Sequence, residues 1–138
     1  MTDTIRYWTD HSRNPFLWIT GDPEIGDRTW IGPFVVIDGA GGLEIGDDCS
    51  IAGGAHIYTH EMRSSGREGA IERSPTVIGD RVYIGANAVV QMGSVIEDDA
   101  TIGAGAVVTK GTHVDAGDTW AGVPARRIDE GRDQSQPE

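Results

Sequence analysis

Two of the four histidines, His56 and His60, lie four residues apart at the start of a polar stretch, "EMRSSGREGAIERSPT". A neutral imidazole can take a proton from a hydroxyl near pH 7, so a histidine held at a fixed exposed position is a candidate general base. His56 directly precedes an aliphatic residue of a regular pattern, which predicts an outward-pointing strand residue. His60 falls where that pattern stops. We interpret His11 and His113 as surface residues.

Few other side chains suggest chemistry. Cys49 is the only cysteine, so no internal disulfide can form, and its position predicts packing at a crowded corner. No Ser, His and Asp arrangement is evident, so a covalent enzyme intermediate is not indicated. Lys110 is the only lysine, and it lies near the C-terminal end together with Arg126 and Arg127. These three cations are candidates for binding an anion.

The net charge of −11, with 22 acidic and 11 basic residues, limits the partners. Such a surface repels a phosphate backbone, so nucleic acid is not an expected partner. A high negative charge with a single lysine favours an organism that lives in concentrated salt, where screening relieves self-repulsion; the alternative is simply an acidic, soluble protein. No apolar run reaches the roughly 20 residues of a membrane helix, and no signal peptide is recognisable. We therefore expect a cytoplasmic protein without a membrane span.

Aliphatic residues recur every six positions along most of the chain. An amphipathic helix would need a period near 3.6, and a half-buried strand would alternate. A period of six fits neither and predicts a solenoid of short parallel strands joined by tight corners. The glycine that often follows each aliphatic residue is expected to supply backbone freedom at the corner. The aliphatic positions are Ile25, Ile31, Ile37, Ile45, Ile51, Ile57, Ile78, Ile84, Val90, Ile96, Ile102, Val108 and Val114.

The same pattern predicts the organisation of the chain. Residues 1–21 lack it and are expected to cap the open end of the first coil. Residues 22–129 form the repeat region, and residues 130–138 are predicted to be a disordered tail. Ile57 and Ile78 are separated by a number of residues that is not a multiple of six. We therefore predict that residues 61–76 form an extended loop at one edge of the prism.

Two segments, "IGDRVYIGANAVVQMGSVIEDDATIGAGAVVTKG" and "AGVPARRI", resemble the C-terminal half of the galactoside, maltose and xenobiotic O-acetyltransferases. These enzymes are hexapeptide-repeat acyltransferases, and the resemblance covers residues 22–129. It implies an all-β fold, a left-handed parallel β-helix in the form of a prism with one extended loop. The left hand comes from this resemblance alone, because parallel crossovers in general favour the right hand. It also implies acetyl-CoA as co-substrate, with no metal.

The resemblance implies roles for single residues. His60 matches the histidine that precedes the extended loop and acts as general base, which implies direct attack of an acceptor hydroxyl on the thioester. The backbone of two alanines would line the pantetheine arm, and three other residues would hold the nucleotide end. The implied coenzyme contacts are Ala86, Ala104, Thr109, Lys110 and Arg126.

The residues do not assign the acceptor; we expect a small molecule with a carbohydrate hydroxyl, and an amino-sugar amine is the alternative. In the coil that would hold it, "FVVIDGAGGLEIG", Asp38 is the only obvious polar side chain. Family members are trimers with the active site between subunits. We therefore expect a homotrimer in which His60 of one chain faces the coenzyme-binding coils of the next.

Two alternatives stay open at this point. A γ-class carbonic anhydrase shares the predicted fold, and His56 and His60 could supply two of its three zinc ligands. However, the coil that begins "IGDRVYIG" has no histidine where that class has one. The second alternative is a non-catalytic β-helix that serves as an assembly scaffold.

Overall fold

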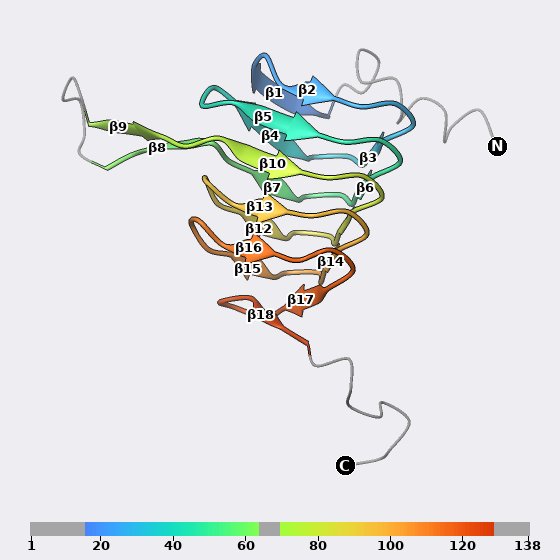
Figure 1. Cartoon of the computed structure of the whole chain (residues 1–138). Helices are drawn as coiled ribbons and strands as arrows, with labels where there is room; N and C mark the ends of the chain where they lie inside the picture. Colours follow the sequence, from blue (N-terminus) through green and yellow to red (C-terminus); the bar gives the residue numbers. More distant parts are fainter. Residues whose placement is uncertain (1–15, 64–69, 129–138) are drawn as a thin grey trace, which may run out of the picture.

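The computed structural model describes residues 16–63 and 70–128. These residues form a parallel β-solenoid whose coils stack along one axis, with the N-terminal coil at one end and the C-terminal coil at the other (Figure 1). This confirms the predicted all-β solenoid, whereas its left hand stays a prediction from the resemblance. Among the described residues there is no helix long and apolar enough to cross a membrane.

Three parallel sheets form the faces of the prism, and each coil contributes one strand to each sheet. Sheet A contains β1 (Trp18–Gly21), β4 (Val36–Gly39), β7 (His56–Ile57), β12 (Val89–Val90) and β15 (Val107–Val108). Sheet B contains β2 (Glu24–Ile25), β5 (Leu43–Ile45), β10 (Thr76–Ile78), β13 (Val95–Ile96) and β16 (His113–Val114). Sheet C contains β3 (Trp30–Ile31), β6 (Ser50–Ile51), β11 (Tyr83–Ile84), β14 (Thr101–Ile102), β17 (Thr119–Ala121) and β18 (Arg126–Arg127).

The chain runs from sheet A to B to C, so three kinds of corner join the sheets. We name them the A–B, B–C and C–A corners. β18 differs from the other strands of sheet C because it turns back and pairs antiparallel with β17. The final strand therefore closes the C-terminal end of sheet C as a hairpin.

The period-six residues form the core, as predicted. Their backbones pair in register between coils, for example Ile37 with Ile57 in sheet A and Ile84 with Ile102 in sheet C. Every predicted aliphatic position from Ile31 to Val114 is buried, and Ile25 in the first coil is partly buried. Cys49 is buried at a B–C corner, and its thiol donates to the carbonyl of Gly79 at 3.0 Å. Burial raises the pKa of this thiol, consistent with the predicted packing role.

The expected reason for the glycines after the aliphatic residues was wrong. Gly46 and Gly79 are not among the residues with positive φ. A Cβ on Gly46 would lie 2.2 Å from a carboxylate oxygen of Asp80, and one on Gly79 would lie 2.2 Å from the equivalent oxygen of Asp98. These carboxylates accept backbone N–H groups of the preceding coil. Close stacking of the coils, and not backbone freedom, therefore requires glycine at these corners.

The solenoid begins earlier than predicted. Residues 18–21 were assigned to the cap, but they form β1, and Ile19 pairs with Ile37 in register. Ile19 lies six residues before Ile25, so it continues the same period. Residues 1–15 of the predicted cap and residues 129–138, which include the predicted tail, lie outside the described residues.

The predicted loop is in large part a β-hairpin. β8 (His60–Met62) and β9 (Ile71–Arg73) pair antiparallel and extend as an arm from an A–B corner (Figure 1). The predicted loop end at residue 76 was too late, because Thr76 is fully buried and pairs with Leu43. The pairs run from His60 with Arg73 at the prism to Met62 with Ile71 further out, so two short strands replace part of the expected loop.

The core residues are expected to carry most of the stability. Ile84 is fully buried at the centre of sheet C, so Ile84→Ala should lower the free energy of unfolding by about 2–5 kcal/mol. The adjacent Tyr83 points outward and is 44% exposed, so Tyr83→Ala is the matched control and should cost well under that amount. Urea unfolding of both variants provides the measurement. Equal losses would contradict the assignment of inward and outward positions.

Candidate functional site

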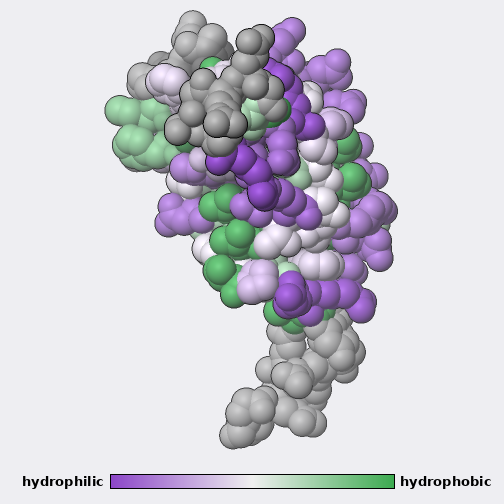
Figure 2. Space-filling view, turned by 90° about the vertical axis from the view of Figure 1, so that its left-hand side faces the viewer, coloured by the Kyte–Doolittle hydropathy of each residue, from purple (hydrophilic) through white to green (hydrophobic). Residues whose placement is uncertain are grey.

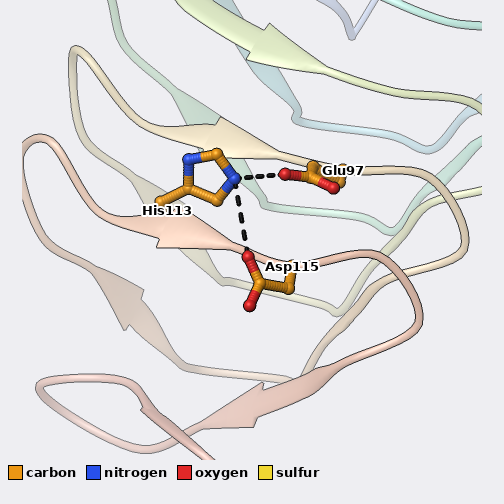
Figure 3. A group of neighbouring side chains, drawn as sticks. All are labelled: Glu97, His113 and Asp115. Carbon is orange, nitrogen blue, oxygen red and sulfur yellow. Dashed lines mark hydrogen bonds and ion pairs between the residues drawn. The ribbon is translucent and has the colours of Figure 1, made fainter.

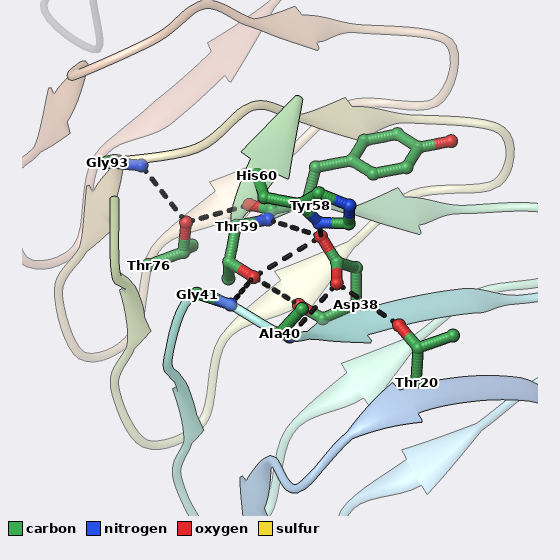
Figure 4. Close-up of polar contacts among 9 residues, drawn as sticks. All are labelled: Thr20, Asp38, Ala40, Gly41, Tyr58, Thr59, His60, Thr76 and Gly93. Carbon is green, nitrogen blue, oxygen red and sulfur yellow. Dashed lines mark hydrogen bonds and ion pairs between the residues drawn. The ribbon is translucent and has the colours of Figure 1, made fainter. Parts of the chain in front are cut away.

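His60 begins the arm at an A–B corner, directly after sheet A. Its side chain is 37% exposed, and its Nδ1 atom lies 2.5 Å from Oδ2 of Asp38 (Figure 4). Asp38 belongs to β4 of the preceding coil, and its side chain is only 4% exposed. The two residues therefore form a carboxylate–imidazole pair in which the carboxylate is buried and the imidazole is partly exposed.

Asp38 is held by a network of donors. Its carboxylate accepts hydrogen bonds from the backbone N–H of Thr59 at 3.0 Å, from that of Ala40 at 3.0 Å, and from the Thr20 hydroxyl at 3.1 Å. Burial favours the neutral acid, but these bonds and the one to His60 together outweigh burial and lower the pKa of Asp38 to about 2. The carboxylate is therefore ionised near neutral pH.

An ionised carboxylate can only accept a hydrogen bond, so Nδ1 of His60 must carry the proton in this contact. The Nε2 atom of a neutral His60 then keeps its lone pair and can accept a proton. The sequence did not identify Asp38 in this role. The repeat could have indicated that Asp38 lies near His60. Ile37 pairs with Ile57, which places Asp38 beside Tyr58 in the next coil, one residue before Thr59.

The turn into the arm is fixed by a second set of bonds. The Thr59 hydroxyl donates to the backbone oxygen of Asp38 at 2.8 Å and accepts the N–H of Gly41 at 2.8 Å. Ser74 N–H, at the returning end of the arm, donates to the Thr59 carbonyl at 2.9 Å. Thr76 donates to the Tyr58 carbonyl at 2.9 Å (Figure 4). Both ends of the arm are therefore attached to the coil that carries His60.

His60 lines a cavity of about 350 Å³ on the outer side of the A–B corner. Its other lining residues are Tyr58, Glu61, Gln91 and Met92. The lining combines an aromatic ring, an amide, a carboxylate and a thioether around the imidazole. Such a small cavity, with apolar and polar groups beside a positioned base, can hold a hydroxyl-bearing molecule.

Lys110 lies below the arm and forms an ion pair with Glu61. Lys110 and Arg63 lower the pKa of the Glu61 carboxyl, which keeps it ionised. The backbone N–H of Lys110 also donates to the Gln91 side chain at 3.2 Å. The structure thus brings Lys110 and His60 to the same side of the prism. Thr109 is exposed at the same corner, and its hydroxyl bonds to that of Thr112.

The predicted pantetheine residues lie elsewhere in the chain. Ala86 and Ala104 occupy C–A corners, whereas His60 occupies an A–B corner, so the width of sheet A separates the two groups. Arg126 is exposed in β18 beyond the last C–A corner, and its guanidinium donates to the Ala125 carbonyl at 3.2 Å. Within residues 16–63 and 70–128, Arg126 has no carboxylate in ion-pair range. A single chain does not join all the predicted site residues.

His56 and His113 lie apart from the Asp38–His60 pair, and His11 lies outside the described residues. His56 points outward from β7, and its Nδ1 lies 2.8 Å from the Tyr58 hydroxyl. His113 is exposed on sheet B, as expected. In the part of the chain that the structure describes, neither His56 nor His60 belongs to a group of three converging metal ligands.

Comparison with known proteins supports the family resemblance. The family model described as the hexapeptide repeat of succinyl-transferase matches residues 24–59 and 75–110, more than half of the chain. A hexapeptide-repeat acetyltransferase from Vibrio cholerae is 29% identical with a TM-score of 0.68, and the match covers 85% of this chain and 72% of that one.

Two sugar acetyltransferases are also similar in structure. A maltose O-acetyltransferase from Clostridium difficile is 28% identical with a TM-score of 0.63, over 81% of this chain and 65% of that one. A galactoside acetyltransferase in complex with coenzyme A is 25% identical with a TM-score of 0.73, over 88% of this chain and 62% of that one. The chain thus spans less than two thirds of the length of either enzyme. The period-six core, the stacked parallel coils and the matched repeats establish that the chain belongs to the hexapeptide-repeat family.

Proposed function

We propose that this protein transfers an acyl group, in the simplest case acetyl, from acetyl-CoA to a hydroxyl of a carbohydrate-like acceptor. The observation that carries the proposal is the Asp38–His60 pair, which presents an imidazole to the cavity at the A–B corner. Similar structures include acetyltransferases that act on maltose and galactosides, one of them with bound coenzyme A. These support both the co-substrate and the class of acceptor.

The proposed reaction needs one base and no covalent enzyme intermediate. His60 Nε2 removes the acceptor hydroxyl proton while the hydroxyl oxygen attacks the thioester carbonyl carbon. The tetrahedral intermediate then collapses, the carbon–sulfur bond breaks, and the protonated His60 returns the proton to the departing thiolate. Asp38 holds the ring through Nδ1 and stabilises the imidazolium that forms between these steps.

A site between subunits would join the residues that one chain keeps apart. The C–A and A–B corners flank sheet A, so a second chain against sheet A could bring its Ala86 and Ala104 toward His60. Figure 2, which looks toward the A–B corner, shows apolar side chains gathered on one side of this face and hydrophilic ones on the other. Trp18 on the outer face of sheet A is 65% exposed. These features support the expected homotrimer.

The coenzyme would bring several phosphates, and the two predicted cations differ in availability. Lys110 is already paired with Glu61, whereas Arg126 has no carboxylate partner among the described residues. We therefore expect Arg126→Gln to weaken acetyl-CoA binding about tenfold, the effect of losing one charge-assisted contact of roughly 1.4 kcal/mol. Lys110→Met should weaken binding less. Titration calorimetry with acetyl-CoA, at one fixed high concentration of potassium chloride, provides the measurement.

Arg28→Gln is the matched control, because Arg28 lies at a B–C corner and pairs with Asp48 at 2.7 Å. It should bind acetyl-CoA with the wild-type affinity. If Arg126→Gln also bound with wild-type affinity, the coenzyme contact would be misassigned. Absence of acetyl-CoA binding by the wild-type protein would overturn the proposed function and favour a scaffold.

A further inference from the structure

Three potential metal ligands converge on the outer face of sheet B (Figure 3). His113 lies in β16, Asp115 follows the same strand, and Glu97 follows β13 of the preceding coil. Nε2 of His113 contacts Oε2 of Glu97 and lies 3.6 Å from Oδ1 of Asp115. All three ligand atoms lie within 4.8 Å of one another. None of these residues lines the cavity beside His60.

The backbone fixes the spacing of this cluster. Val95 pairs with His113 in register, so Glu97 and Asp115 occupy equivalent positions on consecutive coils. The two carboxylates therefore stand one above the other on consecutive coils, and the Nε2 atom of His113 faces both of them (Figure 3). The arrangement follows from the repeat and does not depend on a mobile loop.

The charges of this cluster differ from those of the neighbouring B–C corner. There, Asp48 is paired with Arg28 at 2.7 Å, and Asp99 is paired with Arg81 at 2.8 Å. A guanidinium remains charged at any physiological pH, so those carboxylates are permanently neutralised.

At the sheet B cluster, His113 is the only cation within ion-pair range of Glu97 and Asp115 among the described residues. The ligand atoms of the imidazole and the two carboxylates face a common point, within 4.8 Å of one another. A cation at that point would satisfy all three groups.

We propose that Glu97, His113 and Asp115 form a binding site for a single Zn²⁺ ion. Imidazole nitrogen and carboxylate oxygen are both zinc ligands, and three protein ligands with one water complete a tetrahedron. Zinc bonds of about 2.0–2.1 Å place neighbouring ligand atoms about 3.4 Å apart, close to the 3.6 Å between His113 and Asp115. Glu97 is exposed and can withdraw to this distance by a change of rotamer.

The mixed ligand set distinguishes zinc from hard cations. Magnesium and calcium prefer oxygen ligands, so they would gain little from the imidazole. A zinc ion here would join two consecutive coils near the C-terminal end of the prism. It would therefore stabilise the fold through binding to the native state. The site does not depend on the proposed acyl transfer, and it carries no expected catalytic role.

Titration calorimetry of ZnCl₂ into the EDTA-treated full chain tests the site. We expect one zinc per chain, with at least about tenfold weaker binding in His113→Gln, Glu97→Gln and Asp115→Asn. Zinc should raise the melting temperature of the wild-type protein but not that of His113→Gln. These side chains are exposed, and the far-UV circular dichroism of each metal-free variant verifies its fold.

Matched controls separate this site from other ligands. Glu44→Gln removes an exposed carboxylate elsewhere on sheet B, and His56→Gln and His60→Gln remove other imidazoles. All three should bind zinc as the wild type does. Wild-type zinc affinity in His113→Gln, or no stoichiometric binding, would overturn the site. Equal displacement of zinc by MgCl₂ would also overturn it, because it would indicate only a general acidic surface.

Discussion

Replacement of His60 by alanine is expected to lower kcat by about 10²–10⁴-fold, the range that a positioned general base contributes. The reason is the geometry of the pair: Asp38 holds Nδ1 and leaves Nε2 to face the cavity. No other histidine is among the residues that line this cavity. The measurement is thiol release from acetyl-CoA, with the acceptor that the wild type uses among maltose, methyl β-galactoside and glucosamine.

The binding of acetyl-CoA should be unchanged in His60→Ala, because the predicted phosphate contacts lie on other residues. His56→Ala is the matched control: this histidine points outward from the same coil and contacts Tyr58, not Asp38. It should retain most of the wild-type kcat. Full activity in His60→Ala, with a normal melting temperature, would eliminate His60 as the base.

The core could be predicted from sequence because one period governs it. Each inward position repeats after six residues, and each small corner residue follows four positions later, so local counting identifies Ile84 or Cys49 as buried. The same counting placed His60 at a corner. Extending it to Ile19 would also have placed β1 in the sheet, since that residue has the same spacing.

The contacts at the site could not be counted in this way. Counting places Asp38 beside Tyr58, but its bond to His60 depends on how the chain turns from sheet A into the arm. The pair of Lys110 with Glu61 depends on the direction in which the arm leaves the prism. The arm has no periodic signal, so the side-chain contacts that it makes with the prism could not be predicted by counting.

The predicted coenzyme-binding residues show a second limit of prediction from sequence. The sequence assigned Ala86 and Lys110 to one ligand, but their corners lie on opposite edges of sheet A. A repeat pattern gives the corner to which a residue belongs, yet it does not reveal which corners of two chains meet. The proposed site between subunits would account for this separation.

Asp38→Asn is expected to lower kcat by about 10²-fold or more, because the amide cannot stabilise the imidazolium that forms during proton transfer. Asp38 is not among the residues that line the cavity, and its carboxylate bonds to His60, so it acts as a positioning residue. The Michaelis constant for acetyl-CoA should therefore stay unchanged while kcat falls. A merely structural role would instead lower the amount of folded enzyme and leave the kcat of the folded fraction intact.

Stability provides the second readout for this variant. The low pKa of Asp38, about 2, means that its charge stabilises the fold above pH 4 and loses this effect as pH falls toward 2. Asp38→Asn should lower the free energy of unfolding at pH 7 by about 1–3 kcal/mol, and should flatten its dependence on pH between 4 and 2. Unfolding in urea at several pH values provides the measurement.

Thr20→Val is the control that separates the two effects. The Thr20 hydroxyl donates to Asp38 at 3.1 Å from the coil before it, whereas His60 lies in the coil after it. Removing this hydroxyl should cost about 1 kcal/mol of stability and leave kcat close to the wild-type value. If Thr20→Val and Asp38→Asn reduced kcat equally, Asp38 would serve only the fold. If Asp38→Asn alone lost kcat, the carboxylate would act through the imidazole of His60.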